Sequence, residues 1–171
     1  MTARTDTADP TVVTDADLVL LRRCVQLAAD ALRAGDEPFG SLLVDAGGTV
    51  VFTDHNRVSG GDATRHPEFA VARWAADHLT PGQRAEAVVY TSGEHCAMCS
   101  AAHAWVGLGR IVYATSSAQL TSWFAEWGQP QGPVAPLPIN AVAPDVPVAG
   151  PADALVEEVK ALQARYRNVP S

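Results

Sequence analysis

The sequence predicts an α/β fold, built as one domain around a mixed sheet. A hairpin pattern over residues 41–52, with Gly47-Gly48 at its turn, predicts two antiparallel strands. Residues 87–91 form a continuous apolar run, which is typical of a central strand covered on both faces. Helical patterns flank these strands, and 171 residues are enough to bury a core in one domain.

The N-terminal part is expected to begin with a polar arm and to continue as a helix. Residues 1–13 are rich in Thr and Asp, which predicts a disordered arm, so that residues 14–171 form the single domain. Thr14 or Asp15 is a suitable N-cap, because apolar residues then recur at helical spacing. Gly35 is the natural end of this helix.

Two further helices are predicted in the middle of the chain. The first runs from residue 67 to about residue 79, has an apolar side, and is ended by Pro81-Gly82. The second contains a pair of cysteines and ends near Gly107. On this second helix we expect Trp105 to lie in the core and His103 to face solvent.

The last third of the chain predicts one more strand and a final helix. Residues 110–114 form the strand. Residues 129–151 are rich in Pro and Gly and predict only short strands, such as 139–142, or a long loop closing over a pocket. Residues 152–167 predict a helix with Tyr166 on its apolar side.

The charge balance disfavours nucleic acid as a partner. The formal net charge is −7, and Lys160 is the single lysine of the chain, whereas a phosphate-binding surface needs clustered basic residues. The sequence contains no apolar run of bilayer length and no cleavage-site pattern. We therefore expect a soluble, cytoplasmic protein that has no membrane partner.

Two of the three cysteines and one histidine predict a metal site. Cys96 and Cys99 lie three residues apart at the start of a helix, so their sulfurs share one side of its first turn, where the helix dipole favours thiolate. With His66 they supply three ligands for tetrahedral zinc and leave the fourth position open to water. Glu68 is then a spare carboxylate that can move protons. Cys24 lies on an apolar helical face and is expected in the core, so no disulfide framework is available.

Residues 66–68 and 94–99 together resemble the signature of the zinc-dependent cytidine and nucleobase deaminase superfamily, which is His-x-Glu followed by Pro-Cys-x-x-Cys. One position departs from it, since His95 stands where the family has proline, but proline binds no metal. The resemblance implies a three-layer α/β/α sandwich of the cytidine deaminase type with a mixed central sheet. It also implies hydrolytic deamination, in which zinc activates a water molecule and Glu68 carries the protons.

The same resemblance implies residues that bind the substrate. Phe39 belongs to a Pro-x-Gly segment that enters the first strand, and Asn56 matches a position at which base-specific relatives hold an asparagine against the substrate. The alternative for Asn56 is an ordinary turn residue. His95 either touches the substrate or only caps the cysteine helix.

A second aromatic segment favours a guanine-like substrate. Residues 123–127 place one carboxylate among three aromatic rings, as a base-binding pocket requires. They resemble the guanine deaminase branch, in which a Phe is followed by an acidic residue that reads donor groups of the base. We therefore expect Glu126 and Trp123 to line the pocket. The alternative is a surface helix whose tryptophans pack inward while Glu126 faces water.

Several alternatives remain open at this point. The substrate can be another amino-heterocycle, such as a triazine, cytosine or an oxidised purine. Two other classes are a transfer RNA editing deaminase and a zinc-stabilised module without catalysis. The resemblance also implies a homodimer, in which Tyr166 either completes the neighbouring subunit's site or only packs within its own chain.

Overall fold

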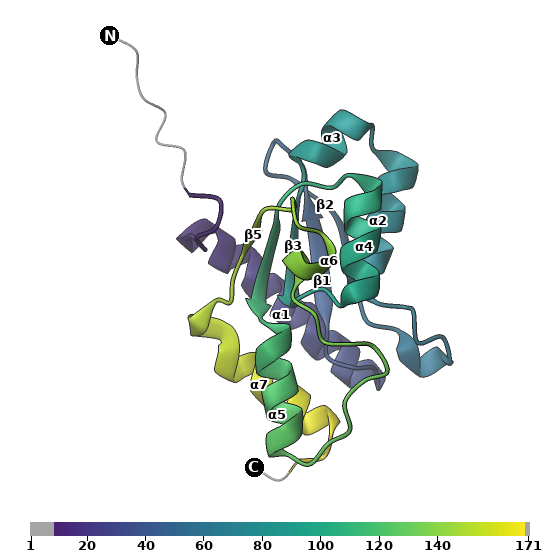
Figure 1. Ribbon diagram of the computed structural model, residues 1–171, viewed down its shortest axis with the longest axis vertical. Coiled ribbons are helices and arrows are strands. Elements are labelled where there is room, and N and C mark those ends of the chain that lie inside the picture. The colour runs from purple at the N-terminus through teal and green to yellow at the C-terminus, as the bar shows by residue number, and fades with distance from the viewer. Residues whose placement is uncertain (1–8, 170–171) are drawn as a thin grey trace.

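The computed structural model of the protein describes residues 9–169 as a mixed sheet with helices on both faces (Figure 1). The sheet has five strands in the order β2-β1-β3-β4-β5. β1 is antiparallel to β2 and β3, whereas β3, β4 and β5 are parallel to one another, so the predicted mixed sheet is confirmed. The strands are β1 Gly40–Val44, β2 Val50–His55, β3 Val88–Gly93, β4 Ile111–Thr115 and β5 Val148–Ala149.

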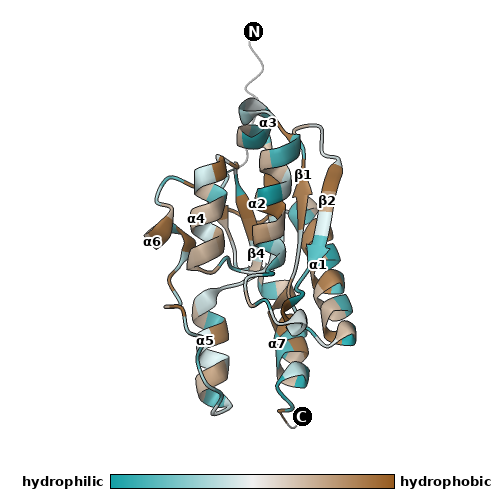
Figure 2. Ribbon diagram, turned by 90° about the vertical axis from the view of Figure 1, so that its right-hand side faces the viewer, coloured by the Kyte–Doolittle hydropathy of each residue, from teal (hydrophilic) through white to brown (hydrophobic). Residues whose placement is uncertain are grey.

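Helices cover the sheet in two layers, and this confirms the three-layer α/β/α sandwich. α1 and α7 pack on one face, and α2 and α4 pack on the other (Figures 1 and 2). Successive residues of β1 face opposite layers, because Leu42 packs with α1 and α7 whereas Leu43 packs with α2. The four helices are α1 Asp15–Ala34, α2 Pro67–His78, α4 Ala97–Val106 and α7 Asp153–Tyr166.

Shorter helices complete the chain between these elements. They are η1 Val58–Gly60, α3 Pro81–Glu86, α5 Ser117–Glu126 and α6 Ile139–Val142. Within residues 9–169, none of the helices combines the length and the apolar character needed to cross a membrane.

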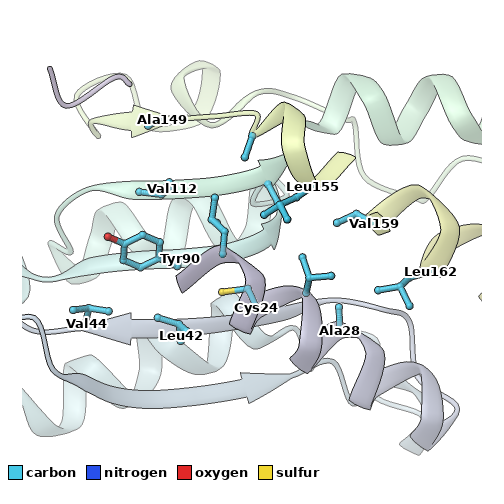
Figure 3. Close-up of a cluster of buried hydrophobic side chains, with 14 of the residues drawn as sticks. Cys24, Ala28, Leu42, Val44, Tyr90, Val112, Ala149, Leu155, Val159 and Leu162 are labelled. Atoms are coloured by element: carbon cyan, nitrogen blue, oxygen red, sulfur yellow. The ribbon is translucent and has the colours of Figure 1, made fainter. Parts of the chain in front are cut away.

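The core between the sheet and the α1/α7 layer is made mainly of aliphatic side chains, with Tyr90 and Trp123 among them (Figure 3). Leu42 and Val112 of the sheet meet Leu155 of α7, and all three are fully buried. Cys24 of α1 lies in the same cluster, as predicted, and burial raises the pKa of its thiol. This cysteine therefore behaves as a small apolar residue.

The start of α1 is fixed by a capping box, which confirms Thr14 as the N-cap. The Thr14 hydroxyl accepts a hydrogen bond from the Asp17 N–H, and the Asp17 carboxylate accepts one from the Thr14 N–H. Arg110 forms an ion pair with Asp17 and donates to the Pro10 carbonyl. Residues 1–8 of the predicted disordered arm lie outside the described residues, whereas the chain contacts the domain at residue 10.

Three expectations for the second half of the chain are wrong. Trp105 is 90% exposed and His103 only 1%, because His103 lies one helical turn after Cys99 on the inward face of α4 and Trp105 lies on the opposite side. The His103 ring also bonds the Gly109 carbonyl, at 2.8 Å. Residues 139–142 form a short helix rather than a strand, since Pro138 precedes it as N-cap and a distant carboxylate binds its first N–H.

Candidate active site

The three predicted metal ligands converge at the N-termini of α2 and α4. His66 is the N-cap of α2, because Pro67 takes the first helical position, where no N–H is needed. Cys96 is the N-cap of α4, and Cys99 lies one turn further inside it. The ligand atoms of these three residues all lie within 4.8 Å of one another.

The distances fit a tetrahedral zinc ion. The Sγ atoms of Cys96 and Cys99 each lie 3.7 Å from His66 Nδ1. Zinc binds sulfur at about 2.3 Å and imidazole nitrogen at about 2.0–2.1 Å, which separates the two ligand atoms by about 3.6 Å in a tetrahedron. The donor set of one imidazole and two sulfurs, with a fourth position left over, is also typical of catalytic zinc. His66, Cys96 and Cys99 would therefore hold the ion.

Of the three groups, only Cys96 is held in the protonation state that binds metal, because the pKa values of the Cys99 thiol and of His66 are both raised. The neighbouring Cys99 thiol, followed by His66, lowers the pKa of Cys96 to about 4, although burial opposes this. The hydrogen bond with Cys96 in turn raises the pKa of His66 to about 9. Cys96 is therefore a thiolate near neutral pH, and the thiolate is the form of cysteine that ligates metals.

Glu68 lies beside the ligands but is not one of them. Its carboxylate is buried, and Oε1 accepts a hydrogen bond of 2.9 Å from the Thr91 hydroxyl. Thr91 is itself the acceptor for the Ser41 hydroxyl, at 2.9 Å, so the two central strands β1 and β3 fix the carboxylate. Burial raises the pKa of Glu68 above its ordinary value. A raised pKa suits a group that takes up and releases a proton near neutral pH.

Asn56 has one side-chain group without a protein partner. The residue is fully buried at the end of β2, where its backbone N–H donates to the Phe39 carbonyl at 3.0 Å. Its Oδ1 accepts from the Val58 N–H, which fixes the orientation of the amide. Its Nδ2 donor has no partner among residues 9–169. A buried donor of this kind is available to an acceptor on a ligand.

Phe39 lies against the strand that leads into the cysteine loop. A Cβ atom at Gly93, the last residue of β3, would come within 2.9 Å of the Phe39 ring, so only glycine lets the ring approach this closely. Phe39 and Asn56 are thus brought together at the metal end of the sheet. Their contact with a substrate stays a prediction.

His95 is buried next to Cys96 and does not cap the helix. Neither ring nitrogen has a hydrogen-bond partner among the described residues, and the ring meets His103 edge-on with centroids 5.5 Å apart. Burial, followed by the nearby His103, lowers the pKa of His95 well below its ordinary value, so the imidazole is neutral. The capping alternative is therefore excluded, and contact with the substrate stays a prediction.

The expectation that aromatic rings enclose the Glu126 carboxylate in a pocket is wrong. Its side chain is 57% exposed, and its carboxylate lies 3.0 Å from Lys160 Nζ. Trp123 and Phe124 pack inward from α5, and this turns Glu126, at the end of the same helix, toward water. Trp123 belongs to the core cluster between the sheet and α7, so within this chain its ring serves packing.

Glu94 has a structural role that the sequence did not reveal. One carboxylate oxygen accepts from the Ser117 N–H at 2.8 Å, and the other accepts from the Ile139 N–H at 2.9 Å. These N–H groups open α5 and α6, so one side chain holds two helix starts against the loop that carries Cys96. The only available signal was an acidic residue two positions before the first cysteine of the pair.

A cavity of about 240 Å³ has His66 in its wall. Its other lining residues are Asp54, Arg57, Asp62, Thr64, Arg65, Phe69, Ala70 and Arg73. None of the five residues predicted to bind substrate lines it, so the cavity is not assigned to the substrate.

A buried carboxylate beside three candidate zinc ligands, at the end of a central strand of an α/β sheet, is typical of a zinc-dependent hydrolase. The chain belongs to the family described as the cytidine and deoxycytidylate deaminase zinc-binding region, which matches residues 14–115. It is thus an enzyme, a hydrolytic deaminase, and zinc is its cofactor.

Similar proteins differ in their named activities. The chain is 34% identical to a probable cytosine deaminase of Schizosaccharomyces pombe over 133 residues, which is 77% of each chain. It is 34% identical to guanine deaminase of Bacillus subtilis over 95 residues, covering 55% of this chain and 61% of that protein. A crystal structure of a mutant of NE0047 in complex with 8-azaguanine shares the fold with a TM-score of 0.71 at 21% identity, over 93% of this chain and 87% of that one.

Proposed function

We propose that the protein deaminates a free amino-substituted heterocycle, and that a guanine-like base is its leading substrate. The observation that carries the proposal is the position of Glu68, a buried carboxylate held by Thr91 next to the metal ligands but not among them. If the zinc site only stabilised the fold, this carboxylate would have no role. Burying a carboxylate costs free energy, and nothing would then offset that cost.

The side chains divide the reaction between them. When bound, zinc supplies a water that ionises near neutral pH. Glu68 is positioned to take one proton from the attacking water, whose oxygen bonds to the amino-bearing carbon, and to pass that proton to a ring nitrogen. Glu68 then takes the second proton, from the hydroxyl now on that carbon, and gives it to the amino group, so that the carbon–nitrogen bond breaks, ammonia leaves and a carbonyl remains. The hydroxyl of Thr91 keeps the carboxylate in one position throughout.

Asn56 and Phe39 are proposed to hold the heterocycle. The free Nδ2–H of Asn56 donates to an acceptor on the ring, and the Phe39 ring offers a flat apolar wall. A carbonyl or a ring nitrogen satisfies the Asn56 donor equally well, so these two residues favour no particular base.

The leading substrate is supported by the relatives rather than by Glu126. The similarity to guanine deaminase of Bacillus subtilis and the 8-azaguanine complex of NE0047 both favour a guanine-like base. Cytosine is the second candidate, because the probable cytosine deaminase of Schizosaccharomyces pombe is equally identical over a longer stretch. A transfer RNA substrate is disfavoured by the formal net charge of −7.

The experiment is a comparison of catalytic efficiency across free bases and RNA. Protein reconstituted to one zinc per chain is assayed for ammonia release from guanine, cytosine, melamine and a transfer RNA anticodon stem-loop. The proposal predicts that guanine has the highest kcat/KM and that RNA gives none. If the kcat/KM for cytosine exceeds that for guanine tenfold, cytosine replaces guanine as the leading substrate. Ammonia release from RNA alone would refute a free-base substrate.

We also propose that the protein is a homodimer joined through α4. The ten residues of α4 include no Asp, Glu, Lys or Arg, and Trp105 projects from this helix into solvent. An exposed apolar helix face suits a second copy of the same chain. Equilibrium sedimentation should give a dimer for the parent and a monomer for Trp105→Glu; a monomeric parent would remove the proposal. In such a dimer, the contribution of Tyr166 to the neighbouring site also stays a prediction.

A further inference from the structure

The end of α7 carries two polar atoms that are buried without a protein partner. They are Oε1 of Gln163, whose side chain is fully buried, and Nε of Arg167, whose side chain is 15% exposed. Neither atom has a role in the reaction described above. A buried polar atom without a protein partner destabilises the protein unless a water or a ligand satisfies it, so both atoms are candidates for contact with a ligand.

Contacts with one short segment fix both side chains in place. Gln163 Nε2 donates to the Pro38 carbonyl at 3.2 Å, so the amide has one orientation and Oε1 is the atom left free. The Arg167 guanidinium lies 3.6 Å from the Glu37 carboxylate, and its Cζ lies 3.7 Å from the centroid of the Phe124 ring. The free atoms are therefore a fixed acceptor on Gln163 and a fixed N–H donor on Arg167.

The same segment leads directly to the metal end of the sheet. Phe39 follows Pro38, and its ring lies against Gly93 at the start of the loop that carries Cys96. The Phe39 carbonyl is also the acceptor for the Asn56 backbone N–H. The end of α7 is thus connected through consecutive residues to the groups proposed to hold the substrate.

We propose that Gln163 and Arg167 are specificity residues that read a ring N–H and an adjacent carbonyl of the substrate. The two residues are four apart, so they lie on one side of the helix about one turn apart. Gln163 Oε1 accepts from the ring N–H, and Arg167 Nε–H donates to the carbonyl oxygen. The inference rests on the proposed function and narrows its substrate class to amino-heterocycles that contain a –NH–C(=O)– edge. Guanine and cytosine have this edge, whereas adenine and melamine do not.

The experiment measures binding rather than turnover. Hypoxanthine carries the –NH–C(=O)– edge, purine lacks it, and neither has an amino group to lose. Titration calorimetry on zinc-reconstituted protein should show at least about tenfold tighter binding of hypoxanthine than of purine, because a site built for a hydrogen bond rejects the analogue without it. Gln163→Met and Arg167→Met should each bring the ratio of the two dissociation constants, purine over hypoxanthine, close to one. Arg165→Met, an exposed arginine on the same helix, should leave the ratio unchanged.

Each outcome decides the inference separately from the proposed function. The inference is overturned if both variants keep the parent's ratio of dissociation constants. It is also overturned if the parent binds hypoxanthine and purine equally well. Equal weakening of both ligands assigns the two residues a structural role and also overturns it. If Gln163→Met does not fold, Arg167→Met near the helix end decides alone. If the parent releases no ammonia from any heterocycle, the proposed function fails, while the binding ratio still tests whether α7 reads the edge.

Discussion

The metal end of the protein and the end formed by α5 and α7 are built in different ways. At the metal end, pairs of functional residues are two or three positions apart, as in Cys96 and Cys99, and helix N-caps orient them. At the other end, contacts join residues that are far apart, such as Gln163 and Pro38, which are separated by 125 positions. The metal ligands are therefore encoded by the local spacing within two short segments, whereas the groups proposed to recognise the substrate depend on how the finished fold brings distant segments together.

The largest effect is expected from a change at the metal end. Cys96→Ala should lose zinc and turnover, and the free energy of unfolding should fall by at least about 3 kcal/mol, because metal binding is coupled to folding. Cys24→Ala is the matched control, since this cysteine is buried but lies outside the site. Metal analysis should find one zinc per chain in the control and none in Cys96→Ala. Zinc at the parent level in Cys96→Ala would show that the ligands are wrongly assigned.

Asn56→Asp tests whether the unpartnered Nδ2 donor of Asn56 binds the substrate. The variant keeps the acceptor that binds the Val58 N–H but replaces the free Nδ2 donor by an oxygen. The kcat/KM for guanine should fall about tenfold to a hundredfold, because an acceptor on the substrate would then face another acceptor. Zinc content should not change, and Asn168→Asp, at an exposed position, serves as control. Parent-level kinetics would return Asn56 to the role of an ordinary turn residue.

The pH dependence of the free energy of unfolding tests whether the His103 imidazole is buried on the inner face of α4. Burial lowers the pKa of His103 to about 4, against about 6.5 in the unfolded chain. Between these values the unfolded chain binds more protons, so the free energy of unfolding falls as the pH falls from about 6.5 to about 4. Urea unfolding at pH 7 and pH 5 should show a smaller loss for His103→Gln than for the parent. His78→Gln, at an exposed position, should lose as much as the parent; an equal loss in all three proteins would place His103 in solvent.

The smallest effect is expected from Glu126→Gln. An exposed ion pair with Lys160 contributes about 1 kcal/mol or less, so stability should change within that range. The KM values for guanine and for cytosine should stay within about twofold of the parent, because the carboxylate lies outside the site. A tenfold rise in KM for guanine, without a change for cytosine, would contradict this expectation and show that Glu126 contacts the substrate.

The predictions that succeeded depend on local rules. His66, Cys96 and Cys99 could be identified because Pro67 and the spacing of the cysteines define two helix starts, and helix starts orient the side chains of their first turn. The mixed sheet followed from one hairpin and one apolar run. The one distant contact required, between His66 and the cysteines 30 and 33 positions away, was implied by the resemblance of the two segments to the superfamily signature.

The predictions that failed needed tertiary information. Aromatic residues around Glu126 suggested a pocket, but which side of α5 faces the core depends on where α7 packs. The helix at residues 139–142 starts where the Glu94 carboxylate meets its first N–H, 45 positions away in sequence. The role proposed for Gln163 depends in the same way on its contact with Pro38. Short-range patterns do not report contacts of this range.

Ammonia release by Glu68→Ala tests the central claim most directly, because this side chain separates catalysis from metal binding. With both proteins reconstituted to one zinc per chain, ammonia release from guanine is measured for the variant and the parent under identical conditions. The account predicts a fall in kcat by at least about a hundredfold, with zinc content unchanged. Turnover by Glu68→Ala at the parent rate would contradict the role of Glu68 as the proton carrier and, with it, the proposed mechanism.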